Sequence, residues 1–365
     1  MKILVISGSF FPHISPRSFR TTELAKELSR RGNDVTLLIP ESEYDLSSFI
    51  SENKLSFKSY KRKLEKRRFV GNHFIDKVLF HYLHQFLMYP SLGNMKLLEK
   101  KACCETGYDL LITIAVPHFI PWAVGNLYAQ GKTIAPIWIS DCGDPFMLSG
   151  SVKQRPPFWF KVLEKRWCHM CSYISVPTES SYLGYYPEFK DKIRVIPQGF
   201  NLEEISIPEY KKNSVPTFAF AGGFIPQKRD PKKLLDFLLK LDRPFRFVAY
   251  GNNVQLFLEP YKRKLGEKLI IEKPVPRNDL LPILAQMDFL INIGNSTKVQ
   301  TPSKLIDYAL TGRPYLTIES DDIKEEVLLE FLDGNYEHAD PKIDLNKYDI
   351  HNVAQQFLDL CATRA

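Results

Sequence analysis

The residues whose types and spacing carry the clearest chemistry lie between Asp288 and Leu316, in the stretch DFLINIGNSTKVQTPSKLIDYALTGRPYL. An apolar run and a polar loop are followed there by Pro302, Ser303 and Lys304, which are expected to open a helix. The free N–H groups and the dipole of a helix start favour an anion, and Lys304 adds a full positive charge. Asp307 follows one turn later, where a carboxylate can accept hydrogen bonds from two ribose hydroxyls. The pattern indicates a nucleotide site, although an ordinary βα unit with a surface Lys–Asp pair has the same spacing.

A second cluster of glycines and cations follows the apolar segment Thr217–Ala221. The pair Gly222-Gly223 lets the backbone approach a ligand closely, and Lys228 and Arg229 bring positive charge to the same loop. We interpret this loop as a phosphate site. A plain turn with a solvated lysine is the alternative.

Three side chains in the first half of the chain fall after predicted strands. His118 follows the strand predicted over Tyr108–Val116, and Asp141 and Asp144 follow the one predicted over Thr133–Ile139. Ligands collect at the carboxyl ends of parallel strands, so these residues are candidates for catalysis. Either aspartate could orient or deprotonate a hydroxyl group, but a cap and turn pair would look the same.

The elements that must position these residues alternate between short apolar runs and helical segments. Strands are predicted over Lys2–Phe10, Asp34–Ile39, Tyr108–Val116, Thr133–Ile139, Tyr173–Val176, Thr217–Ala221, Arg246–Tyr250, Leu269–Ile271, Phe289–Ile291 and Tyr315–Ile318. Helices are predicted over Thr21–Gly32, Ile75–Leu87, Lys161–Ser172, Asp279–Gln286, Pro302–Leu310 and Lys347–Cys361. The loop Pro12–Arg20 carries Arg17 and Arg20, either of which could supply a positive group to a ligand, although plain surface arginines are the alternative. This βαβ start lacks G-x-G-x-x-G, so a dinucleotide cofactor has little support.

The composition is that of an ordinary globular protein with two domains. The chain has 365 residues, of which 44% are hydrophobic and 25% charged, and a chain of this length exceeds one small core. No apolar run is long enough to cross a membrane. The six cysteines show no disulfide spacing, so a reducing cytoplasm is the expected compartment. Cys168 and Cys171 have no second cluster to complete a metal site, and no metal is expected.

Positive charge is concentrated in one segment. The net charge is +7, and the run Lys54–Arg68 carries eight cations (Lys54, Lys58, Lys61, Arg62, Lys63, Lys66, Arg67 and Arg68) against one anion, Glu65. The helix predicted next, Ile75–Leu87, has aromatic and aliphatic residues at helical spacing. Together they suggest contact with an anionic membrane on its inner face. A solvated charged face and a core helix are the alternatives, and no nucleic-acid partner is expected.

The segment PSKLIDYALTGRPYL resembles the C-terminal signature of retaining family 4 glycosyltransferases. Gly312-Arg313-Pro314 is similar to the Gly-Lys-Pro that ends their helix, and Asp307 falls on the second Glu of their pattern. Val299 stands where the first Glu would be. Branches that act in bacterial surface-polysaccharide synthesis have a similar P-x-K-x-x-[DE]-Y form.

Two further segments carry the resemblance, each with a glycine where the family has an arginine. WISDCGDPF is similar to D-F-R-D-P-W, with Gly143 in place of Arg. The loop Gly222–Arg229 resembles G-R-x-x-x-x-K-G, with Gly223 in place of Arg and Lys228 on the Lys. Arg229 is a candidate replacement for the missing cation.

The resemblance implies an α/β protein of GT-B architecture, with two Rossmann-like domains whose parallel sheets face across a cleft. The expected division is an acceptor domain over 1–200, a linker over 201–216, a nucleotide-sugar domain over 217–345, and a helix over 346–365 that returns to the first domain. Donor binding is assigned to Gly222, Gly223, Lys228, Arg229, Val275, Pro302, Ser303, Lys304 and Asp307. Asp144, His118 and Lys228 are the catalytic candidates, and Arg17 and Asp141 the acceptor-binding ones.

The activity implied is transfer of a sugar, with retention and without metal or cofactor, from a UDP- or GDP-sugar to a glycan or lipid-linked acceptor. Two other functions share these features. A GT-B sugar-nucleotide 2-epimerase would use the donor without an acceptor. A non-catalytic GT-B subunit would bind a nucleotide or a partner, and the residues at Val299 and Gly223 keep this alternative open.

Overall fold

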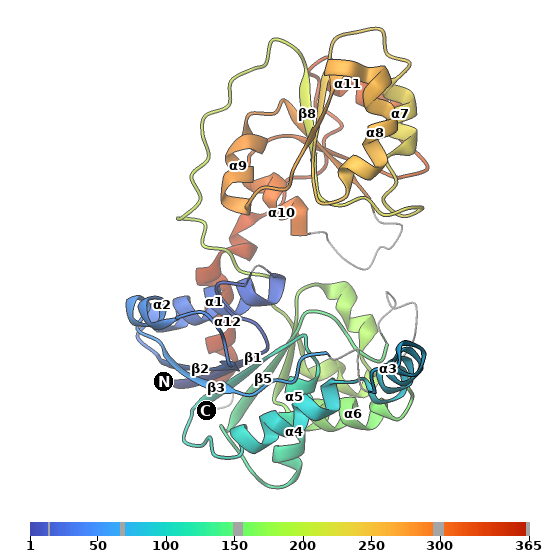
Figure 1. Ribbon diagram of the computed structural model, residues 1–365. Coiled ribbons are helices and arrows are strands. Elements are labelled where there is room, and N and C mark those ends of the chain that lie inside the picture. Colours follow the sequence, from blue (N-terminus) through green and yellow to red (C-terminus); the bar gives the residue numbers. More distant parts are fainter. Residues whose placement is uncertain (14, 66–69, 149–155, 295–302, 363–365) are drawn as a thin grey trace. The chain divides into compact units, whose positions relative to one another are not determined.

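The chain divides into two compact units, drawn in Figure 1. Unit 1 comprises Met1–Asn201 and Asn346–Ala365, and unit 2 comprises Leu202–Leu345. The computed structural model describes residues 1–13, 15–65, 70–148, 156–294 and 303–362. Each unit is described separately below.

Unit 1 is built on a seven-stranded parallel sheet with strand order β3-β2-β1-β4-β5-β6-β7. The strands are β1 (Lys2–Ser7), β2 (Asp34–Pro40), β3 (Ser56–Tyr60), β4 (Leu110–Ala115), β5 (Ile137–Cys142), β6 (Tyr173–Val176) and β7 (Ile193–Val195). In the central register, Val5 lies between Leu37 on β2 and Ile112 on β4. The strands β1, β2 and β4 are buried almost throughout because helices cover both faces of the sheet, whereas the edge strand β3 is mostly exposed.

The helices of unit 1 form two layers. They are α1 (Pro16–Arg30), α2 (Ser47–Glu52), α3 (His73–Leu87), α4 (Ser91–Ala102), α5 (Phe119–Ala129), α6 (Phe160–Met170) and α12 (Ile350–Ala362). Leu98, Trp122 and Trp167 on α4, α5 and α6 form the core on one face. Leu24 and Phe357 on α1 and α12 contribute to the core on the other face.

Unit 2 contains a five-stranded parallel sheet with strand order β10-β9-β8-β11-β12. Its strands are β8 (Thr217–Ala221), β9 (Arg246–Tyr250), β10 (Leu269–Glu272), β11 (Phe289–Ile293) and β12 (Tyr315–Ile318), and its helices are α7 (Lys232–Leu238), α8 (Val254–Leu265), α9 (Arg277–Ala285), α10 (Ser303–Leu310) and α11 (Glu325–Leu332). Helices α7, α8 and α11 cover one face of this sheet, and α9 and α10 the other. The rings of Phe218, Phe247 and Phe289 stack in the core, with centroids 5.0 and 4.7 Å from that of Phe218.

Two of the predicted boundaries that differ from the structure affect candidate residues. Helix α1 begins at Pro16 rather than Thr21 because the Ser15 hydroxyl caps it, accepting a hydrogen bond from the Ser18 N–H (3.1 Å). Arg17 is therefore a helix residue rather than a loop residue. Strand β5 continues to Cys142, so Asp141 lies in the strand and not after it.

The strand order reverses beside the first strand of each sheet. In unit 1 the reversal lies between β1 and β4, and in unit 2 it lies between β8 and β11. Ligands of open parallel sheets bind at the carboxyl ends of the strands at such a point. The candidate residues are located relative to these two edges below.

Candidate functional site

The turn after β8 brings backbone close to the carboxyl edge of the unit 2 sheet. Gly222 has φ +138°, a conformation that favours glycine, and its N–H donates to the Tyr250 carbonyl at 2.8 Å. A Cβ on Gly251 would lie 2.0 Å from the Gly222 carbonyl oxygen, so the turns after β8 and β9 pack tightly together. The glycine pair therefore places half-buried backbone at the point where the strand order reverses.

The ammonium of Lys304, in the first turn of α10, is buried at this turn. Its Nζ lies 4.4 Å from the centre of the Phe220 ring and has no hydrogen-bond partner among the described residues. Burial, together with the charge of Arg229, lowers the pKa of Lys304 to about 6. A buried cation beside a second cation is a site that an anion would stabilise.

Arg229 brings its guanidinium to the same turn. Its Nη1 donates to the Gly223 carbonyl at 3.1 Å, and burial lowers its pKa. The loop that carries it is closed by reciprocal backbone hydrogen bonds between Ile225 and Arg229 (3.0 and 2.8 Å). Gly223, which replaces an arginine of the family pattern, thus has the guanidinium of Arg229 beside it.

The predicted ribose-binding carboxylate has an unpredicted partner. Arg277, the first residue of α9, donates from Nε to Asp307 Oδ1 at 2.7 Å. Burial raises the pKa of Asp307, and the neighbouring Arg277 opposes this rise. Val275 lies two residues before Arg277 and is half-buried.

The other donor-site candidates are less central or are not described. Lys228 is exposed, and its backbone carbonyl accepts a hydrogen bond from the Ser320 hydroxyl (2.8 Å). Pro302 and Val299 lie outside the described residues. Ser303 begins α10, but its side chain also lies outside what is described.

Sequence reasoning missed the residues that hold this turn in place. The Asn253 side chain makes two hydrogen bonds with the Phe224 backbone. Its Oδ1 accepts from the Phe224 N–H (3.0 Å), and its Nδ2 donates to the Phe224 carbonyl (2.7 Å). The Tyr308 hydroxyl accepts from the Ala221 N–H (2.9 Å) and donates to the Ile291 carbonyl (3.0 Å), joining the end of β8 to the middle of β11. Tyr308 lies one turn after Lys304, so it fixes the helix face from which Lys304 reaches Phe220. The Tyr of the P-x-K-x-x-[DE]-Y pattern was visible in the sequence, but its two long-range hydrogen bonds were not.

A pocket of about 450 Å³ lies at the carboxyl ends of β9 and β10 in unit 2. Gly251, Asn252, Glu272 and Pro274 are among the residues that line it. Pro274 immediately precedes Val275, so the pocket adjoins the segment expected to meet a nucleobase.

In unit 1, Arg17 reaches the backbone after β5. A Cβ on Gly143 would lie 2.0 Å from Arg17 Cζ, so the guanidinium fills the space that a side chain at position 143 would occupy. Arg17 also lies 4.0 Å from Asp141, measured from Nη1 to Oδ2. Gly143 is the other position where the family pattern has an arginine, and here too a guanidinium from elsewhere in the unit occupies the place.

Asp141 is a buried ion-pair residue. Its carboxylate accepts from Arg20 Nε (3.0 Å) and Nη2 (2.9 Å) and from the Ser175 hydroxyl (2.6 Å). Burial raises the pKa of Asp141, but Arg20, Arg17 and Ser175 together outweigh this effect and hold the pKa below its usual value. Asp141 therefore stays ionised and can position Arg17 electrostatically.

The two remaining candidates of unit 1 lie close to this cluster. The His118 ring packs against Phe146, with centroids 4.9 Å apart. Burial lowers the pKa of His118 to about 4, and the charge of Arg17 contributes. Asp144 follows Gly143 and is exposed. The structure thus brings Arg17, Asp141 and His118 together and leaves Asp144 at the surface beside them.

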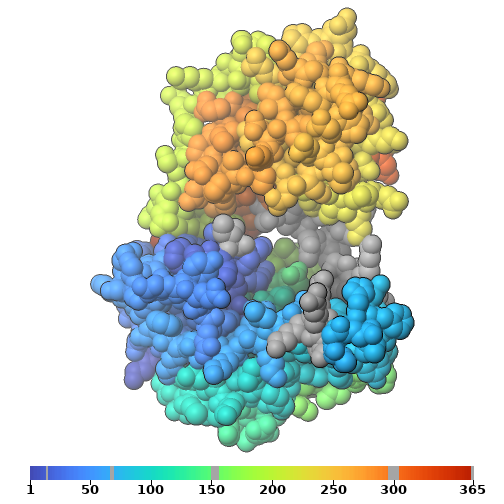
Figure 2. Space-filling model, viewed as in Figure 1, coloured from blue at the N-terminus to red at the C-terminus, as the bar shows by residue number. Residues whose placement is uncertain are grey.

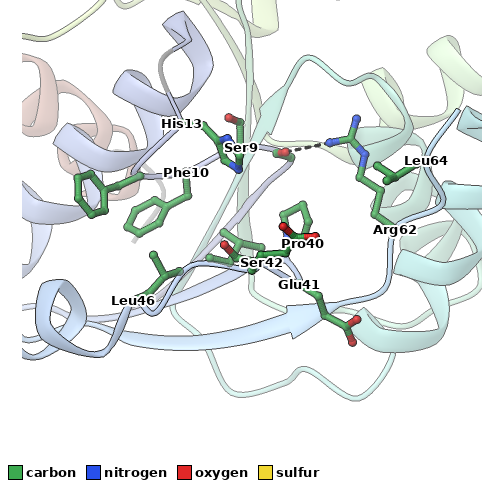
Figure 3. A pocket seen from close by; sticks show the side chains of 13 residues that line it. Ser9, Phe10, His13, Pro40, Glu41, Ser42, Leu46, Arg62 and Leu64 are labelled. Carbon is green, nitrogen blue, oxygen red and sulfur yellow. Dashed lines mark hydrogen bonds between the residues drawn. The ribbon is translucent and has the colours of Figure 1, made fainter.

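A pocket of about 520 Å³ opens beside the loop after β1 (Figure 3). Ser9, His13, Pro40, Glu41 and Arg62 are among its lining residues. Figure 3 shows the Arg62 guanidinium turned toward this loop, where Nη1 donates to the Gly8 carbonyl (3.3 Å). The pocket lies at the ends of β1, β2 and β3 and offers both charged and hydroxyl groups to a polar ligand.

Two features are absent from the part of the chain that the structure describes. The described residues contain no group of three or more His, Cys, Asp and Glu side chains that could hold a metal ion. None of the helices in the described ranges has the length and hydropathy to cross a bilayer.

Solved structures with the same architecture include several sugar-transferring proteins. A glycosyltransferase from Rickettsia africae ESF-5 is 13% identical, with a TM-score of 0.62 over 99% of this chain and 98% of its own. The lipopolysaccharide outer core galactosyltransferase WaaB is 12% identical, with a TM-score of 0.60 over 100% of both chains. A UDP-GlcNAc 2-epimerase from Neisseria meningitidis, bound to UDP-GlcNAc, is 11% identical, also with a TM-score of 0.60 over 100% of both chains. No protein-family model matches the sequence, and no curated protein matches it.

Two parallel sheets with these strand orders, together with these structural neighbours, define the class of fold. The chain has the two-domain α/β GT-B fold. The predicted fold class is therefore confirmed. At these identities the similarity establishes the fold and leaves the reaction to be argued from the residues.

Proposed function

We propose that the protein is a glycosyltransferase that moves a sugar from a nucleotide-diphosphate donor to a glycan or lipid-linked acceptor. The observation that carries the proposal is the pair of cations at the Gly222–Gly223 turn, where the Lys304 ammonium is buried and Arg229 is half-buried. Lys304 Nζ has no hydrogen-bond partner among the described residues, and Arg229 Nη1 lies on the Gly223 carbonyl (3.1 Å). A diphosphate placed there would gain two cations and close backbone.

These cations suit the departure of a nucleoside diphosphate. When the bond from the sugar C1 to the diphosphate oxygen breaks, its electron pair stays on that oxygen, and Lys304 and Arg229 would stabilise the charge. The acceptor hydroxyl forms the new bond to C1 and loses its proton. Asp144 is proposed to receive or orient this proton, with the neutral His118 imidazole as a hydrogen-bond acceptor.

The finer features of the proposal rest on the family resemblance. The match around Lys304 and Asp307 supports transfer with retention, without a metal, by attack on the face from which the diphosphate leaves. The pocket beside Pro274 suits the base of a UDP- or GDP-sugar, and the pocket beside Arg62 suits the acceptor. A role in surface-polysaccharide synthesis in the cytoplasm follows from the same resemblance.

One other function has support from an observation. The 2-epimerase neighbour shares the fold, and an epimerase would need the same diphosphate site. Such an enzyme would consume donor with no second sugar present. A non-catalytic nucleotide-binding subunit would consume none.

The test is a melting-temperature panel with UDP, GDP, dTDP, CMP and ADP, followed by incubation with the sugar nucleotide of whichever base binds. A ligand at 100 times its Kd adds about 2.7 kcal/mol of stability. Lys304→Met should abolish the shift. Lys264→Met is the matched control. Lys264 is exposed in the last turn of α8 and precedes the amino end of β10, whereas the Gly222–Gly223 turn lies at the carboxyl ends of the strands. Absence of a shift with every nucleotide would contradict the proposal, and donor turnover without an acceptor would favour the epimerase.

A further inference from the structure

Helix α3 carries a stripe of apolar side chains on the surface of unit 1. The stripe recurs every four residues, so it follows one face of the helix. Its members are Phe74, Val78, Tyr82 and Phe86, which are 74%, 54%, 56% and 40% exposed. The only buried residue of α3 is Asp76, whose carboxylate accepts from the N–H groups of Val70 (2.7 Å) and Gly71 (3.1 Å). The interpretation of this helix as a core element is therefore wrong.

The stripe continues onto the start of α6. The rings of Phe86 and Trp159 stack with centroids 6.2 Å apart, and Trp159 Nε1 donates to the Phe86 carbonyl (3.2 Å). Phe158 and Val162 beside them are 80% and 59% exposed. We call the stripe together with Phe158, Trp159 and Val162 the α3 patch. In Figure 2 the side chains of α3 lie at one side of unit 1, in light blue.

Exposed cations flank the α3 patch. Lys77 lies on α3 itself and Lys161 on α6, and both are exposed. Lys61 and Lys63, which precede α3 in the chain, are exposed as well, as is the anion Glu65. Not every cation of the basic run is available, since Lys58 pairs with Glu105 (2.6 Å).

We propose that the α3 patch attaches the protein to an anionic lipid bilayer. Aromatic and aliphatic side chains on one face of a helix, with lysines beside them, are what an interfacial helix presents to acyl chains and anionic head groups. Trp and Tyr prefer this interface because their rings are apolar and their N–H and O–H groups reach water. The charge balance selects this occupant over an ordinary protein surface, because Lys77 and Lys161 lie on the two helices that form the patch while the carboxylate of Asp76 is buried and hydrogen-bonded.

The protein contains its own reporter for the attachment. Of the four tryptophans, Trp122, Trp138 and Trp167 are 1%, 0% and 2% exposed, whereas Trp159 is 41% exposed. A blue shift of tryptophan emission on adding vesicles, together with protection from acrylamide, would therefore come from Trp159. Trp159→Phe should remove both signals and leave vesicle binding itself largely intact.

The experiment is cosedimentation of the full chain with vesicles, without any donor. Binding is expected with phosphatidylcholine vesicles that contain phosphatidylglycerol, and at least about tenfold weaker binding with phosphatidylcholine alone. Phe74→Ser/Val78→Ser should lower the partition coefficient at least about tenfold, and Lys77→Ala about fivefold. Leu256→Ser is the matched control, because Leu256 on α8 of unit 2 is 78% exposed and lies outside the patch.

Three results would overturn the proposal: no binding to anionic vesicles, binding that Phe74→Ser/Val78→Ser leaves unchanged, or a Trp159 emission that vesicles do not shift. A dimer in solution that the same double variant dissociates would assign the patch to a second copy of the chain. Since no nucleotide or acceptor enters the assay, its failure would leave the proposed sugar transfer untouched.

Discussion

Donor binding should take up a proton at Lys304 and weaken as the pH rises. Burial and the neighbouring Arg229 lower the pKa of Lys304 to about 6 in the empty site. A diphosphate beside the ammonium raises this pKa, because an opposite charge favours the charged form. Only the protonated form gains the attraction, so affinity is greatest below pH 6 and is lost as the pH rises above it.

The magnitude follows from the protonated fraction. Lys304 is about half protonated at pH 6 and about 1% protonated at pH 8. Affinity should therefore fall about 50-fold over this interval, which corresponds to about 2.3 kcal/mol. At pH 7, binding should take up about 0.9 proton per site.

Isothermal titration calorimetry in buffers of different ionisation enthalpy measures both quantities. A nucleotide sugar is the ligand of choice because its diphosphate is esterified at both ends and does not titrate near pH 6, unlike UDP or GDP. Lys304→Met should bind weakly and without pH dependence, while Lys264→Met should behave as the unaltered protein. Affinity that is flat between pH 6 and pH 8, or a slope that survives in Lys304→Met, would refute the assignment of Lys304 to the diphosphate.

Three further substitutions test the supporting residues. Gly143→Ala places a Cβ 2.0 Å from Arg17 Cζ, so displacement of this cation should lower kcat/KM at least about tenfold while donor binding is unchanged; full activity would separate Arg17 from the reaction. Asn253→Ala removes both hydrogen bonds to the Phe224 backbone and should weaken donor binding by about 1–2 kcal/mol in calorimetry, whereas unchanged affinity would show that the turn holds its shape unaided. Burial raises the pKa of Glu27, but the arginines of its own helix and a histidine of α12 lower it to about 2 from 4.5, so its contribution is present above pH 4.5 and is lost as the pH falls toward 2. Glu27→Gln should therefore lower the free energy of unfolding of unit 1 by about 2 kcal/mol at pH 7 and by little near pH 2, as urea titrations would measure; an equal loss at both values would contradict the ion-pair explanation.

Most strands were predictable because each is a short apolar run between turn residues. The structure has Thr217–Ala221, Arg246–Tyr250 and Tyr315–Ile318 as predicted. Strand β5 was placed too early because its second half contains Ser140 and Asp141, which look like loop residues. Both are buried and hydrogen-bonded, Ser140 to Thr113 (3.1 Å), and such partners cannot be read from local pattern.

Helices were predictable only where one face is polar. Helix α5 was missed because its residues from Phe119 to Leu127 are all buried, and a helix buried all round has no amphipathic period. The start of α1 was missed because Pro16 was taken as a loop residue. In the structure it occupies the first turn, where proline lacks no needed donor.

The candidate site was predictable as a set of segments but not as a set of contacts. The sequence placed Gly222, Arg229 and Lys304 after strands of one domain, and the structure gathers them at one turn. The pairing of Arg277 with Asp307 joins residues 30 positions apart. Only the packing of α9 beside α10 brings this pair together.

The two glycines that depart from the family pattern now have a common physical explanation. At each position the pattern has an arginine, and at each the structure brings a guanidinium from another residue to the glycine. Arg17 fills the space beside Gly143, and Arg229 bonds the Gly223 carbonyl. A guanidinium that reaches the carboxyl end of a strand from a neighbouring helix or loop supplies the same charge there as an arginine at the glycine position would. Gly143 and Gly223 are therefore weaker evidence against catalytic activity than the sequence alone suggested. An arginine substituted at either position should crowd the guanidinium already there and should not raise activity.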